Sequence, residues 1–140
     1  MATYQKFQPF VDDVMEGVHA FASDAVTIAL TNAANAPVVT NGVLLDLTII
    51  SYTNLSTRLI VTTSSTQTTG TYSLILVDHV LTASGGSVAA FRYVVIYNDT
   101  PTSAPVDPLV CFFDYGSDLT LADTETLTVD FNAGGLFTLV

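Results

Sequence analysis

The sequence predicts an all-β fold, a two-sheet β-sandwich of the jelly-roll type with one short N-terminal helix. Short runs of aromatic and β-branched residues recur along the chain, most of them alternate with a period of two, and turn-forming residues separate them. The spacing of strand–helix–strand units is absent, which excludes a parallel α/β fold. An immunoglobulin-like sandwich is the second choice. A chain of 140 residues fits a single domain over residues 1–140.

Two runs form the expected centre of the sheet, Phe91–Asn98 and Pro108–Tyr115. Both are apolar on both faces, so we expect them to be covered on both sides. The linker 99–107 is polar and contains two prolines, which is typical of an exposed loop rather than a tight hairpin. The aromatic and β-branched members are the expected core: Phe91, Tyr93, Val95, Phe112 and Phe113.

Residues 7–18 form the expected helix. Apolar side chains recur there at spacings of three or four, and Pro9 suits a first helical turn. Gly17 weakens the far end, so the helix should have about two turns and end near His19.

The alternating pattern places the remaining elements. Residues 24–31 are expected as a half-buried strand, and residues 43–52 as a strand that places Leu45, Leu47 and Ile49 on one face. The Ser/Thr-rich stretch 62–70 is expected as a mobile turn region. Further strands are expected at 58–63, 71–82, 119–121, 124–131 and 136–140, with loops at 32–42, 84–87 and 116–118.

The charge balance excludes two classes of partner. Thirteen acidic and three basic residues give a net charge of −10. Lys6, Arg58 and Arg92 cannot form the basic stripe that nucleic-acid binding needs, and anionic membrane surfaces are disfavoured for the same reason. No apolar run approaches the roughly 18 residues of a membrane helix, and the amino terminus does not have the pattern of a signal peptide. With 49% hydrophobic and 11% charged residues, the domain is expected to hide surface against a partner or another copy.

The candidate catalytic and metal-binding groups are few. His79 follows Asp78 directly, so along a strand the two side chains point to opposite faces and cannot form a relay. His19 is too far along the chain to complete a cupin-type metal site. We therefore expect no enzyme activity and no cofactor.

Three aspartates surround one turn, Asp114, Asp118 and Asp123, and carboxylates in a loop can hold calcium. Their spacing does not match an EF-hand, and solvated turn aspartates are the alternative account. Cys111, the single cysteine, lies in an expected core strand and is interpreted as a small buried hydrophobe.

Five segments together resemble virion structural proteins of tailed bacteriophages: Phe10–His19, Ser23–Asn32, Thr82–Gly86, Phe91–Thr100 and Phe113–Ser117. Within that group the chain is most similar to the jelly-roll capsid cement (decoration) proteins, of the kind found on Bordetella phage heads. The resemblance spans nearly the whole chain, and its elements are scaffold signatures rather than catalytic motifs.

The resemblance implies a protein that is made in the bacterial host cytoplasm and binds the outer capsid surface of the virion. There it would clamp neighbouring major capsid protein subunits and associate with itself, with a homodimer favoured over a trimer. A packaged genome would repel a subunit of charge −10 inside the shell, so an external position fits the composition. The alternative is a tail-fibre or receptor-binding β-sandwich that recognises the host surface.

The partner-binding residues are expected in loops and in the N-terminal segment. Stiff loops lose little entropy on docking, and apolar terminal segments can become ordered on a partner. For the N-terminal aromatics, the alternative is that they cap the open end of the sandwich itself. The candidates are Tyr4, Phe7, Phe10, Pro37, Pro101 and Pro105.

Overall fold

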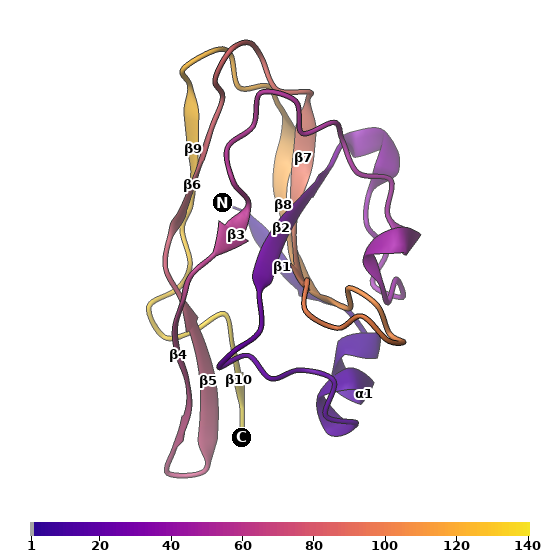
Figure 1. The fold of residues 1–140 in the computed structure, drawn as a ribbon, viewed down its shortest axis with the longest axis vertical. Helices are drawn as coiled ribbons and strands as arrows, with labels where there is room; N and C mark the ends of the chain where they lie inside the picture. The colour runs from indigo at the N-terminus through magenta and orange to yellow at the C-terminus, as the bar shows by residue number, and fades with distance from the viewer. Residues whose placement is uncertain (1) are drawn as a thin grey trace.

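A five-stranded antiparallel sheet forms the centre of the molecule (Figure 1). The structure is a computed structural model that describes residues 2–140. The sheet has the strand order β1–β8–β7–β2–β3, so strands from both ends of the chain meet in it. Its members are β1 (Thr3–Lys6), β2 (Val26–Thr31), β3 (Leu59–Ile60), β7 (Phe91–Asn98) and β8 (Leu109–Leu119).

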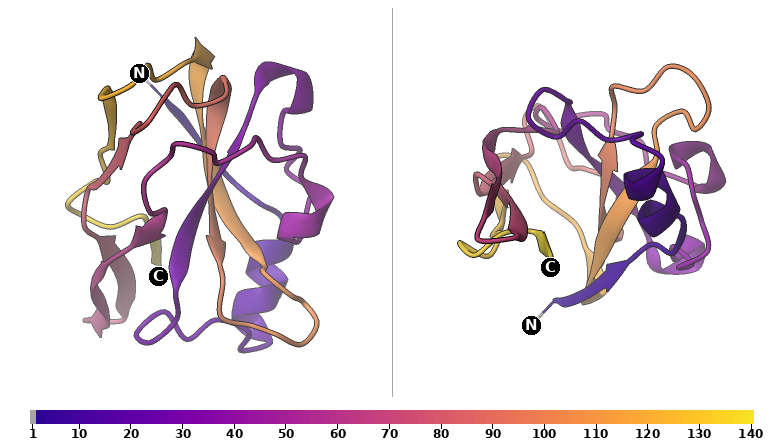
Figure 2. Two further views of the ribbon diagram at one scale, coloured as in Figure 1. Left: turned by 45° about the horizontal axis from the view of Figure 1, so that its top comes forward. Right: turned by 90° about the horizontal axis from the view of Figure 1, so that it is seen from below.

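Two smaller antiparallel sheets cover one face of the central sheet, and helical segments lie on the opposite side (Figures 1 and 2). The small sheets have the orders β10–β5–β4 and β6–β9. Their strands are β4 (Thr62–Thr68), β5 (Thr71–Leu76), β6 (His79–Thr82), β9 (Thr126–Val129) and β10 (Phe137–Leu139). The helical segments are α1 (Pro9–Met15) and the 3-10 turns η1 (Ala33–Asn35) and η2 (Leu44–Asp46).

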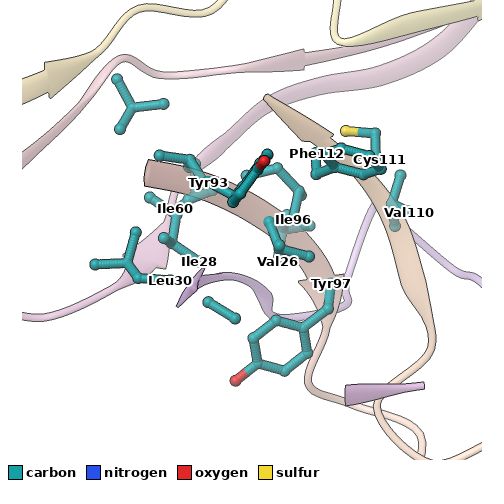
Figure 3. Packing of buried hydrophobic residues seen from close by; sticks show 14 of the residues in the cluster. Val26, Ile28, Leu30, Ile60, Tyr93, Ile96, Tyr97, Val110, Cys111 and Phe112 are labelled. Carbon is teal, nitrogen blue, oxygen red and sulfur yellow. The ribbon is translucent and has the colours of Figure 1, made fainter. Parts of the chain in front are cut away.

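The core fills the space between these layers. Every residue of β2 is buried, because layers cover both faces of the central sheet, and this corrects the half-buried strand expected at 24–31. Side chains from β2, β3, β7 and β8 meet in this core (Figure 3). Of the five predicted core residues, Phe91, Tyr93, Val95 and Phe112 are buried, and Phe113 is half-buried. The predicted all-β sandwich with one short helix is confirmed, and the finer jelly-roll assignment stays a prediction.

The strand expected at 43–52 is wrong. Residues 44–46 form η2 instead, and the Leu45 side chain is 93% exposed. The Asp46 carboxylate accepts hydrogen bonds from the main-chain N–H groups of Gly42 (2.7 Å) and Val43 (3.1 Å). These bonds close a tight turn, and a side chain that bonds the local backbone competes with strand pairing.

The expectation for the Ser/Thr-rich segment is also wrong. Residues 62–68 form β4, as β-branched residues favour, and the turn is confined to Thr69 and Gly70, which have φ of 50° and 84°. The long strand expected at 71–82 is divided into β5 and β6. At the break, the Asp78 carboxylate accepts from Phe131 N–H (2.8 Å), and the chain passes from one small sheet to the other.

The strands β1 and β8 and the helix α1 differ in part from the prediction. Residues 3–6 were not expected as a strand, yet they pair as β1 with β8. The strand β8 continues through Gly116, where a turn was expected, and its register against β7 shifts between Phe91 and Tyr93. The helix has about two turns as predicted, but it spans Pro9–Met15 and ends before the expected end near His19. The chain turns away from it at Gly17, where φ is 73°.

Candidate functional site

A buried polar network lies where β7 ends. The Asn98 amide nitrogen donates to Asp24 Oδ2 (2.6 Å) and to His19 Nδ1 (3.1 Å), and its oxygen accepts from Thr100 N–H (3.1 Å). Asp24 Oδ2 also accepts from Ala20 N–H at 2.7 Å. Asn98 is fully buried. The network therefore joins the segment after α1 to the start of the 99–107 loop, and it has the character of a structural clamp.

The His19 ring is held as a neutral imidazole. Its Nδ1 accepts from an amide N–H, so the ring proton is on Nε2, which has no hydrogen-bond partner among residues 2–140. The ring stacks on Phe21 at 4.7 Å between centroids. Burial lowers the pKa of His19 to about 4, against a smaller opposing effect of Asp24.

Three segments on the helical side of the molecule form one surface, which we call the loop layer: α1, residues 36–47 and residues 99–107 (Figure 1). Main-chain hydrogen bonds tie them together. Gln8 N–H donates to Val39 O (2.8 Å), and Leu44 N–H donates to Asp107 O (2.9 Å). Leu109 N–H donates to Gly42 O at 2.9 Å, which fixes the layer to β8.

The loop layer exposes large apolar side chains from all three of its segments. Leu45 is 93% exposed and Met15 is 79% exposed, and others are about half exposed. The sequence pattern did not predict this surface, because Leu45 was expected on one face of a strand with Leu47 and Ile49. The nearby glycine and aspartate at positions 42 and 46 were the available signal for a turn. The exposed members are Val11, Met15, Val38, Leu45 and Val106.

The N-terminal aromatic residues are divided between the core and the surface. Phe7 and Phe10 are buried and contact Phe112 (5.1 Å between centroids) and Phe137 (5.0 Å). They cap the sandwich of their own chain, as the alternative interpretation expected, and neither offers surface to a partner. Tyr4 is 40% exposed on the edge strand β1. Burial of its hydroxyl and the neighbouring Cys111 thiol raise its pKa.

The candidate prolines lie in the loop layer. Pro37 is buried, whereas Pro101 and Pro105 are half-buried. These two line a hollow of about 380 Å³ with Asp24 and Thr100. The structure therefore brings Pro101 and Pro105 together at the polar network and leaves Tyr4 elsewhere, on the edge of the central sheet.

The three turn aspartates serve separate local contacts. Asp114 forms a two-point ion pair with Arg92 (2.7 and 2.9 Å), and this partner lowers the pKa of the carboxyl group. Asp118 accepts from Ala33 N–H (3.0 Å), and Asp123 accepts from Gly85 N–H (2.9 Å). Within residues 2–140, no cluster of three or more histidine, cysteine or acidic side chains is placed to hold a metal ion.

Residues in the described part of the chain also line two apolar hollows. One, of about 270 Å³, is lined by His19, Phe21, Ser65 and Tyr72, where the Ser65 hydroxyl bonds Tyr72 Oη at 2.8 Å. The other, of about 340 Å³, is lined in part by Phe113 and lies between β8 and β9. Cys111 is buried and free, and burial raises the pKa of its thiol.

No family model, curated protein or solved structure matches this chain. Among residues 2–140, none of the helices has the length and apolar character needed to cross a membrane. The loop layer combines exposed apolar side chains from three segments with the polar network that holds the start of the 99–107 loop.

Proposed function

We propose that the protein is a structural virion protein that binds the outside of a bacteriophage capsid and cements neighbouring major capsid protein subunits. The observation that carries the proposal is the loop layer. Large apolar side chains from three separate segments are exposed there on one side of a folded domain, as in a surface that binds another protein. The resemblance to phage cement proteins supplies the identity of the partner.

The construction of the loop layer supports this role. Its segments are joined by main-chain hydrogen bonds and fixed to β8, so little order has to be gained on binding. The buried Asn98 amide holds the start of the 99–107 loop through Thr100. A partner therefore meets a preformed apolar surface. The free energy gained by burying Leu45 or Met15 is then not reduced by the entropy cost of ordering a flexible segment.

The charge supports an external position. With a net charge of −10, the protein would be repelled by a packaged genome if it lined the interior of the shell. Outside the shell, each copy that contacts two capsid subunits adds a bond between them. Internal pressure then has to break several contacts together, so modest binding per copy stabilises the head.

The test replaces an exposed apolar residue of the loop layer. Burial of a leucine side chain contributes about 1.5–3 kcal/mol, so Leu45→Ser should weaken binding to capsids that lack the protein by about tenfold or more. The melting temperature should stay unchanged, because Leu45 is 93% exposed. Val80→Ser is the matched control, since Val80 is 49% exposed on β6, on the other side of the molecule.

Capsid occupancy of the variants is measured by quantitative gel analysis of sedimented particles. If Leu45→Ser and Val80→Ser decorate capsids equally, the loop layer is not the attachment surface. If the unchanged protein does not bind capsids at all, the proposed function is wrong.

A further inference from the structure

Within residues 2–140, β4 is the longest strand that lies at the edge of a sheet. It spans seven residues and lies at the end of the sheet β10–β5–β4, with β5 on one side only (Figure 1). The other terminal strands of the two larger sheets are shorter: β1 has four residues, β10 has three and β3 has two. An edge strand carries unpaired main-chain N–H and C=O groups, which are a template for pairing with another strand.

This edge lacks two of the devices that usually protect sheet edges, charged side chains and prolines. No charged residue, histidine or proline occurs between Arg58 and Asp78, although the chain has a net charge of −10. Charged side chains and prolines are the usual devices that keep edges apart. Most other edges have them, since β1 ends at Lys6, β3 follows Arg58, and the strands β6 and β9 are flanked by Asp78 and Asp130. The strand β10 has no charge or proline, but it spans only three residues.

The register between β4 and β5 shows which main-chain N–H and C=O groups of β4 point away from β5. A two-residue turn, Thr69–Gly70, joins β4 to β5, so the pairs Thr68–Thr71 and Thr66–Ser73 exchange main-chain hydrogen bonds. The main-chain groups of Ser65 and Gln67 then point to the open edge. The regular part of the strand runs from Ser64 to Thr68, because the register shifts between Thr62 and Ser64. Thr66 is its centre.

Apolar side chains are exposed next to this edge. Leu59 is 51% exposed and Val61 is 64% exposed, immediately before β4. Val77 is 47% exposed and donates its main-chain N–H to Val61 O at 2.9 Å. The uncharged edge therefore continues into an apolar patch at the base of the hairpin.

We propose that β4 pairs with β4 of a second copy of this chain, antiparallel and about a two-fold axis at Thr66. In this register Ser65 of each copy faces Gln67 of the other, and the two pairs supply four main-chain hydrogen bonds. The occupant is a second copy because residues 59–77 carry no charge, so two copies of this chain, each with a net charge of −10, meet here without opposing charges at the contact. Each hairpin tip reaches back towards Val61 of the other copy.

The pairing forms a continuous six-stranded sheet from the two three-stranded ones. The loop layer lies on the far side of each domain from β4, so both loop layers stay open in the dimer (Figures 1 and 2). Pairing through β4 does not depend on capsid attachment. The inference can therefore be tested separately from the proposed function.

Thr66→Cys tests the axis directly. Facing residues in a non-hydrogen-bonded antiparallel pair have Cα atoms about 4.5 Å apart, within reach of a disulfide. Oxidation of this variant should give a covalent dimer, since Cys111 is buried and cannot compete. Ser73→Cys is the matched control, because Ser73 pairs with Thr66 on the same face but lies three strand spacings, about 14 Å, from its counterpart.

Charged residues in place of Thr66 test the β4–β4 pairing without a disulfide. Thr66→Lys and Thr66→Glu each place like charges opposite one another and should raise the dimer dissociation constant about fivefold or more, whereas an equimolar mixture should restore the dimer as a heterodimer. Sedimentation velocity measures both. Ser73→Lys should leave the dissociation constant unchanged.

Four results would overturn the proposal. They are a strictly monomeric wild-type protein, equal cross-linking of Thr66→Cys and Ser73→Cys, lysine and glutamate variants that dimerise like the wild type, or a mixture that stays monomeric. A monomeric protein whose Thr66→Lys variant loses capsid binding would assign the edge to a capsid strand instead. Loss of capsid binding in Leu45→Ser with dimerisation intact leaves this inference standing.

Discussion

Replacement of Phe7 by alanine tests whether the N-terminal segment belongs to the folded domain. The Phe7 side chain is fully buried, its ring lies 5.1 Å from Phe112, and its main-chain N–H donates to Val110 O at 3.2 Å. Truncation of such a buried phenylalanine costs about 3–5 kcal/mol, from lost transfer energy and the cavity that remains. Tyr4 is 40% exposed and touches Phe113 edge-on at 5.5 Å, so Tyr4→Ala should cost about 1 kcal/mol.

Urea unfolding followed by circular dichroism gives the free energy of unfolding for both variants by linear extrapolation. The two positions lie in the same segment, so any general effect of disturbing the N-terminus is common to both. We expect Phe7→Ala to lower the free energy of unfolding by at least about 2 kcal/mol more than Tyr4→Ala does. Equal and small losses would mean that residues 3–7 form a separate arm, and that β1 is not part of the stable sheet.

Three further predictions follow from single contacts. Asp46→Ala removes the two hydrogen bonds that close the turn before η2 and should lower the free energy of unfolding by about 1 kcal/mol, which thermal denaturation measures. Gly86→Ala should lower the melting temperature, because φ is 144° there and an added Cβ would lie 2.7 Å from Asn54 Nδ2; an unchanged melting temperature contradicts this geometry. The folded-state pKa of His19 is lowered to about 4 from 6.5, so the unfolded chain binds more protons between these values, and stability should fall as the pH drops from 6.5 towards 4. Because the ring is not fully enclosed, we expect a loss of about 2 kcal/mol rather than the full shift, and His19→Gln should remove this pH dependence.

The centre of the fold was predictable because local pattern and tertiary environment agree there. The run Phe91–Asn98 is apolar on both faces, and the structure covers both faces of β7. The strand predicted at residues 43–52 is absent although its apolar residues alternate with a period of two. The Asp46 carboxylate accepts hydrogen bonds from the backbone just before it and so fixes a turn there. The pattern of hydrophobicity does not contain that hydrogen bond.

The candidate site was less predictable than the fold. Pro101 and Pro105 were expected in an exposed loop, and the structure places them together in the loop layer. An apolar segment with Phe7 and Phe10 has the same sequence pattern whether it binds a partner as an arm or caps its own domain. The position of the central sheet decides between the two, and it buries both side chains. The free edge of β4 depends on which strands pair, which is a non-local property of the chain.

Attachment to the outside of a capsid through the loop layer is the function that we propose for this domain. A reconstruction of the intact phage particle at a resolution that shows side chains tests it most directly. We expect density for the domain over the whole outer lattice of the head, with Leu45 and Met15 against the major capsid protein. Density for a few copies at the tail, or for copies inside the shell, would contradict it.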